Sequence, residues 1–179
     1  LTLRGVIDAG GQETDTTPLR VAIMTDLPGL LGDFQAMRAA EGKALAAVLT
    51  GQLDLIADLT SAAQHETAAR TATQADTLRE GLARVLSATD AVDPARLAQE
   101  LALLALKTDV TEELDRLAAH VEAARAHVAD SAPAGRKLDF LMQEFMREAN
   151  TLCSKAQSLA LTRIGLDLKT VIDQMREQV

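Results

Sequence analysis

Aromatic residues and cysteine are scarce in this chain, and their scarcity excludes several kinds of protein. Tryptophan and tyrosine are absent, and phenylalanine occurs three times in 179 residues. The single cysteine, Cys153, cannot form an internal disulfide, which fits a reducing compartment. No uninterrupted apolar run reaches the roughly 18 residues of a membrane span, and the first residues lack the layout of a signal peptide. We therefore expect a cytoplasmic protein with no membrane partner.

Several common catalytic motifs are also missing from the sequence. It contains no Cys-x-x-Cys pair, no glycine-rich phosphate loop, no His-Glu-x-x-His and no glycine-flanked serine. A function must therefore be sought in other groupings of polar side chains.

Alanine and leucine are abundant, with 61 residues between them. Both favour helices, and no alternating strand pattern competes after residue 30. The hydrophobic share of 47% is enough for a sizeable core. The sequence predicts an all-α fold, an elongated bundle of long helical hairpins.

The positions of glycine, proline and capping residues divide the chain into segments. This pattern predicts an irregular N-terminal segment over residues 1–18 and a helical domain over residues 19–179. Breaks are expected at Pro28-Gly29, at the turn that leads to Asp93 and Pro94, in residues 130–135, and at a new cap on Ser154. The predicted helices cover residues 19–26, 32–63, 66–86, 94–106, 108 or 109 to 129, 136–152 and 155–179.

Acidic side chains dominate the chain, but their excess is confined to its first part. The formal net charge is −8, which at first sight argues against a nucleic-acid partner. Residues 1–134 carry a net charge of −9, whereas residues 135–179 carry +1. The last quarter of the chain is therefore the part expected to face anions.

Two of the predicted helices carry a polar strip beside their apolar face. In the helix over residues 109–129, Glu113 and His120 lie on one strip. In the helix over residues 136–152, Glu144 and Glu148 lie on another, one turn apart. Two carboxylates at this spacing can hold Mg²⁺ or Mn²⁺.

A purely structural interpretation of the second strip is open as well. Glu144 and Glu148 can pair with Lys137 and Arg147 at helical spacing, an arrangement that contributes only a few tenths of a kcal/mol. Spacing alone does not separate this interpretation from a metal site.

Three segments resemble one bacterial family. They are residues 109–120 (DVTEELDRLAAH), residues 135–151 (GRKLDFLMQEFMREANT) and residues 172–179 (IDQMREQV). From about residue 97 to the end the chain closely resembles the YicC/YloC family, cytoplasmic proteins described as metal-dependent endoribonucleases. Met146 departs from the pattern, because the family typically has Asn there.

The resemblance implies that the sequence is the C-terminal portion of such a protein, without the family's N-terminal domain. It also implies RNA as the substrate and a homo-oligomer, a hexamer in the family. A rival function, from a different class, is a helical RNA-binding or scaffolding adaptor that acts through a partner nuclease.

The resemblance also changes the interpretation of the two strips. An antiparallel hairpin through residues 130–135 would bring the two strips together, where they could bind a divalent ion, Mg²⁺ or Mn²⁺. The expected catalytic and metal-binding residues are Glu113, His120, Glu144 and Glu148. Basic side chains nearby would then hold RNA phosphates, and those expected to do so are Arg136, Lys137, Arg147 and Lys155.

Overall fold

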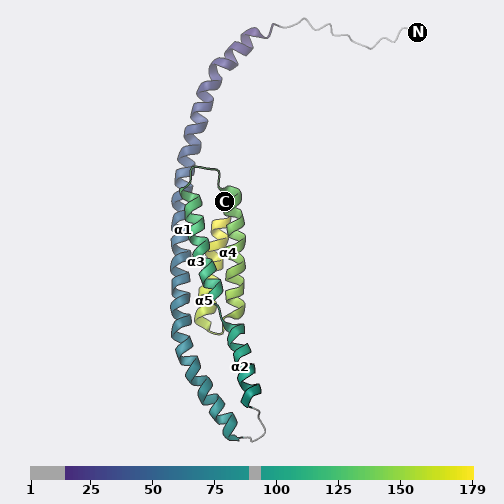
Figure 1. The fold of residues 1–179 in the computed structure, drawn as a ribbon. Coiled ribbons are helices and arrows are strands. Elements are labelled where there is room, and N and C mark those ends of the chain that lie inside the picture. The colour runs from purple at the N-terminus through teal and green to yellow at the C-terminus, as the bar shows by residue number, and fades with distance from the viewer. Residues whose placement is uncertain (1–14, 89–93) are drawn as a thin grey trace, which may run out of the picture. The chain divides into compact units, whose positions relative to one another are not determined.

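The structure is a computed structural model that describes residues 15–88 and 94–179. Every regular element in these two ranges is an α-helix (Figure 1). The helices are α1 (Thr17–Ala88), α2 (Pro94–Thr108), α3 (Thr111–Ala129), α4 (Gly135–Lys155) and α5 (Leu159–Arg176). The predicted all-α class is confirmed.

Helix α1 is one continuous helix of 72 residues, whereas three helices were predicted over this stretch. The expected break at Pro28-Gly29 is wrong, because Pro28 lies inside α1. A proline inside a helix costs roughly 3 kcal/mol, but ending the helix there would require a second, costly nucleation a few residues later. The expected break between residues 63 and 66 is also wrong, since this alanine-rich stretch contains no residue that stops a helix.

The ends of the shorter helices agree with the prediction in some places and not in others. Pro94 is the first residue of α2, as predicted, while the expected cap Asp93 lies outside the described ranges. Of the predicted irregular segment, residues 1–18, the first 14 residues also lie outside them, and Thr17 and Pro18 already belong to α1. Helix α5 begins after Ser158, whose hydroxyl oxygen accepts a hydrogen bond from the Leu161 amide at 3.0 Å. The predicted cap on Ser154 is wrong: this residue lies inside α4, and its hydroxyl donates to the Thr151 carbonyl at 2.9 Å.

Residues 1–44 form the first of two compact units. Its described helical residues, 17–44, are the beginning of α1, and all of their side chains are exposed. By length and composition alone, the stretch Thr17–Arg70 could cross a membrane, with 22% of its most apolar window buried. The mostly buried core helices of soluble proteins and signal sequences near an N-terminus pass the same test, so the absence of a membrane partner stays a prediction. The large exposed apolar residues here are Leu19, Val21, Ile23, Met24, Leu27, Leu30, Leu31, Phe34 and Met37.

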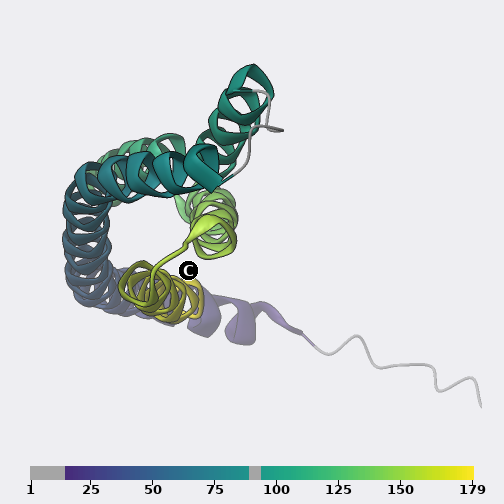
Figure 2. The same ribbon diagram turned by 90° about the horizontal axis from the view of Figure 1, so that it is seen from below.

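Residues 45–179 form the second unit, which contains the core. The turn at residues 130–134 folds α3 and α4 into the predicted antiparallel hairpin, and α4 packs on α5 as well (Figure 2). The rest of α1 adds Leu53 and Ile56 to the same core, both fully buried. Arg125 of α3 also donates to the Asp54 carboxylate of α1 at 2.7 Å. Helix α4 is thus held on two sides, and its polar strip lies against α3.

Candidate functional site

His120 of α3 and two glutamates of α4 form a cluster of potential metal ligands. One ligand atom each from His120, Glu144 and Glu148 lies within 4.8 Å of the others. His120 and Glu144 are half-buried, whereas Glu148 is almost fully buried. Two carboxylates and an imidazole are chemically suited to a divalent transition metal or to Mg²⁺. The hairpin therefore brings three of the four predicted ligands together.

One ring nitrogen of His120, a member of this cluster, has no hydrogen-bond partner among the described residues. This atom, Nε2, is buried. The ring meets Phe145 edge-on, with 5.8 Å between the ring centres. A buried polar nitrogen without a partner is costly, and a bound ion would satisfy it. The residues present therefore fit a divalent ion.

Arg116 connects the cluster to the rest of the strip on α3. Its Nη2 lies 2.8 Å from Oε2 of Glu148 and 3.5 Å from Oε1 of Glu113, and its Nη1 pairs with Glu112. The hydrogen bond to Glu148 raises the pKa of the Arg116 guanidinium above its ordinary value. Arg116 thus stays protonated and supplies the counter-charge for Glu148.

Glu113, the fourth predicted ligand, lies next to the cluster but is engaged elsewhere. Its side chain is 3% exposed, and its Oε1 accepts a hydrogen bond from Nζ of Lys155 at 2.9 Å. The same ammonium donates to the Asp109 carbonyl at 3.0 Å. The other carboxylate oxygen, Oε2, is buried without a partner among the described residues. Glu113 reaches Glu148 only through Arg116, which contacts both.

The structure separates the two interpretations of the glutamates on α4 only in part. Glu144 does have Arg147 beside it, but their Oε2 and Nη1 atoms are 4.0 Å apart, the limit of an ion pair. Glu148 pairs across the hairpin with Arg116 rather than along its own helix. No ion pair within 4.0 Å joins Lys137 to Glu144 or Glu148, all of which are described residues. The purely intrahelical explanation therefore does not account for Glu148.

The four predicted RNA-binding residues differ in how available they are. Arg136 and Lys137 are exposed at the start of α4, and the Arg147 side chain is 76% exposed. Lys155 is less available to RNA than these three residues, because its ammonium pairs with the Glu113 carboxylate. The sequence placed Lys155 at the start of the helix predicted over residues 155–179, whereas it is the last residue of α4 and its side chain reaches α3.

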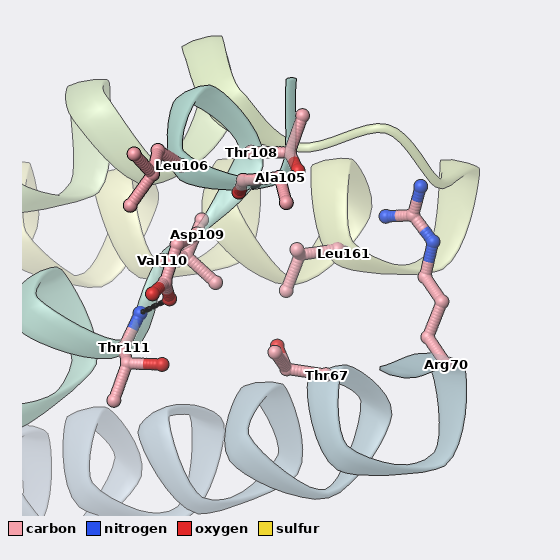
Figure 3. Close-up of a pocket in the computed structure, with 9 residues that line it drawn as sticks. All are labelled: Thr67, Arg70, Ala105, Leu106, Thr108, Asp109, Val110, Thr111 and Leu161. Carbon is pink, nitrogen blue, oxygen red and sulfur yellow. Dashed lines mark hydrogen bonds between the residues drawn. The ribbon is translucent and has the colours of Figure 1, made fainter. Parts of the chain in front are cut away.

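A separate pocket of about 360 Å³ lies where α1, α3 and α5 meet the end of α2 (Figure 3). Thr67 and Arg70 come from α1, and Leu161 closes the side formed by α5. The Asp109 carboxylate in this pocket accepts a hydrogen bond from the Thr111 amide at 2.9 Å. Hydrogen bonding by the side chain and then by the backbone of Thr111 lowers the pKa of Asp109. The Asp109 side chain is therefore engaged in a local turn just before α3, whose N-cap residue is Val110, and is not directed at the cluster.

Comparison with known proteins supports the resemblance carried by α3 to α5. The family model described as endoribonuclease YicC-like, C-terminal, matches residues 63–179. This chain belongs to the YicC-like family. The match includes the whole α3–α4 hairpin and every residue of the cluster.

Two curated relatives extend this YicC-like similarity beyond the matched domain. A probable endoribonuclease YicC from Haemophilus influenzae is 41% identical over 175 residues, which is 98% of this chain and 59% of that protein. A second, from Clostridioides difficile, is 31% identical over 146 residues, 82% of this chain and 50% of that protein. The chain thus spans little more than half the length of the curated relatives that it matches.

Proposed function

We propose that this YicC-like chain is part of a metal-dependent endoribonuclease. The observation that carries the proposal is the cluster of His120, Glu144 and Glu148, whose ligand atoms lie within 4.8 Å of one another. The buried, unpartnered Nε2 of His120 supports a role in binding an ion. The printed names of the relatives, probable endoribonuclease, support RNA as the substrate.

The three cluster residues would hold Mg²⁺ or Mn²⁺, and the bound ion would activate water and stabilise the charge that develops on the phosphate. Glu144 is more exposed than Glu148, so it is the carboxylate that water and substrate reach first. Arg116 positions Glu148 from behind, through the 2.8 Å ion pair. Hydrolysis would add a water oxygen to phosphorus and break one P–O bond of the RNA backbone.

Exposed basic side chains near the cluster are suited to holding the RNA backbone. We place Arg136, Lys137 and Arg147 in this role because all three are exposed on α4. Arg147 also lies beside Glu144, so a phosphate bound there would be close to the cluster. We give Lys155 a different role, as the counter-charge of the buried Glu113 carboxylate.

The experiment is an RNA cleavage assay with the highly purified chain and a structured RNA. Cleavage should require Mg²⁺ or Mn²⁺ and stop when a chelator is added. Cleavage that continues in excess chelator would contradict the metal mechanism.

The rival function, an RNA-binding or scaffolding adaptor, is favoured by one observation. Both buried glutamates, Glu113 and Glu148, already have basic partners, as expected of a structural polar network. Binding of RNA without cleavage by the purified chain, at any metal concentration, would support the adaptor.

A homo-oligomer, a hexamer by family resemblance, is part of the same proposal. Nine large apolar side chains of residues 17–44 are exposed, more than scattered surface residues would give. A second copy of the chain is the partner that we propose for them. A monomer in light scattering at high concentration would contradict this.

A further inference from the structure

A groove on the side of α4 away from the cluster is lined by apolar, amide and basic side chains. Its volume is about 440 Å³, and it lies between α4 and the C-terminal end of α5. Most of its lining comes from α4, and α5 contributes Arg176. It therefore has a different set of walls from the metal-ligand cluster, which lies on the side of α4 that faces α3.

Two methionines form the apolar part of the groove. Met142 is 1% exposed and belongs to the core, while Met146 is half-buried at its edge. Thioether sulfurs are polarisable and make favourable contacts with flat aromatic rings. Met146 therefore offers an apolar surface for a base.

Two side-chain amides flank the methionines. Gln143 donates to the Asp139 carboxylate at 3.2 Å, which leaves its carbonyl oxygen as an acceptor. Asn150 is exposed, and its side chain makes no hydrogen bond to any part of the chain that the structure describes. An amide offers both a donor and an acceptor, which is what reading the edge of a base requires.

Two arginines supply positive charge at the rim. Arg147 is held only loosely, 4.0 Å from Glu144, and Arg176 makes no ion pair within 4.0 Å with another described residue. The planar guanidinium group binds phosphate oxygens in a bidentate manner. Neither arginine would have to give up a close partner to bind an anion.

We propose that this groove binds one nucleotide of a single-stranded RNA segment, with the base on Met146 between the two amides and phosphates on Arg147 and Arg176. The inference rests on the proposed function and adds a site that selects the substrate. Arg147 links the two regions, because it lines the groove and lies beside Glu144 of the cluster. A single strand fits better than a duplex, since bases within an A-form helix cannot be splayed into a groove of this size.

The test measures RNA binding without cleavage, by fluorescence anisotropy of a labelled single-stranded oligonucleotide in the presence of a chelator. Arg176→Ala and Arg147→Ala should each weaken binding about tenfold and reduce the salt dependence by about 0.7 per lost phosphate contact. Arg163→Ala, an exposed arginine elsewhere on α5, is the matched control and should bind like wild type. Asn150→Ala should change the preference among the four bases and leave the salt dependence unchanged.

Crosslinking of the wild-type chain gives a second readout that does not depend on any variant. RNA that contains 4-thiouridine should crosslink to the peptides that carry Met146 and Arg176, located by mass spectrometry after trypsin digestion. If Arg176→Ala and Arg147→Ala bind like Arg163→Ala, or if the crosslinks fall on other helices, the groove is not the site, while the cleavage assay still stands. If the wild-type chain binds no RNA at all, both the groove and the proposed function are wrong.

Discussion

Arg116 on α3 and Glu148 on α4 form an ion pair of 2.8 Å that joins the two helices of the hairpin at the candidate metal cluster. The Glu148 side chain is 4% exposed, so removing Arg116 would leave a buried carboxylate without its ion-pair partner. Replacing Arg116 with Met should therefore lower the urea midpoint of unfolding, followed by circular dichroism. The double variant Arg116→Met, Glu148→Gln should lose less stability than the sum of the losses in the two single variants. Strict additivity would show that the pair is not coupled in the folded protein.

The two glutamates of the cluster should respond differently to the same substitution. Glu144→Gln should leave the helical signal unchanged but reduce RNA cleavage by about 10²-fold or more, because the lost charge acts mainly in the transition state. Glu148→Gln should reduce cleavage to a similar extent and also destabilise the hairpin, since it removes the partner of Arg116. Glu122→Gln, at an exposed position of α3, is the control and should neither reduce cleavage nor destabilise the hairpin. Full activity in both cluster variants would make Glu144 and Glu148 structural residues only.

The close approach of α4 and α5 can be tested at Gly165. A Cβ atom on Gly165 would lie 2.5 Å from Sγ of Cys153, which is too close, so one of the two must move. Gly165→Ala alone should cost about 1–3 kcal/mol through overpacking, partly offset by about 1 kcal/mol of helix propensity. In a Cys153→Ala background the clash is gone, and the same change should become stabilising by up to about 1 kcal/mol. Equal effects in both backgrounds, by urea unfolding, would contradict this packing.

The turn between Asp109 and Thr111, just before α3, predicts a difference in acid stability. Hydrogen bonding by the side chain and backbone of Thr111 lowers the pKa of Asp109 in the folded chain, so the stabilisation is present above the unfolded value of 3.8. It is lost as the pH falls below 3.8 through the folded value. Between pH 5 and pH 3 the wild-type chain should therefore lose more stability than Asp109→Asn, which has no charge to titrate at this position. Parallel profiles of unfolding midpoint against pH would argue against these hydrogen bonds.

Much of the fold could be predicted from local sequence, because helical propensity and turn residues act over a few positions. The ends of α2 and the reversal before Gly135 are examples. The continuity of α1 through Pro28 could not be predicted in the same way. It depends on the balance between one proline and the cost of a new nucleation, and the sequence pattern shows only the proline.

The candidate site was predictable as far as helical periodicity and family resemblance extend. They placed His120, Glu144 and Glu148 on facing strips, and the hairpin brings these three together. They did not show which cation would face which glutamate across the hairpin, since that depends on how the two helices are rotated and offset. The ion pair between Lys155 and Glu113 is the result of that geometry.

Arg176 and the groove beside it were missed for the same physical reason. The groove is formed by the packing of α4 on α5, and no pattern within either helix reveals it. The available signals were the positive charge of residues 135–179 and the position of Arg176 in the last of the three family-like segments.

Direct binding of Mn²⁺ tests the central claim, that His120, Glu144 and Glu148 form a metal site. The measurement is a titration of the chain with Mn²⁺, in which electron paramagnetic resonance reports the free ion. The account predicts one saturable site per chain in the wild type and in Glu122→Gln, and its loss in Glu144→Gln and in His120→Ala. Wild-type binding that is absent, or that survives unchanged in both cluster variants, would contradict it.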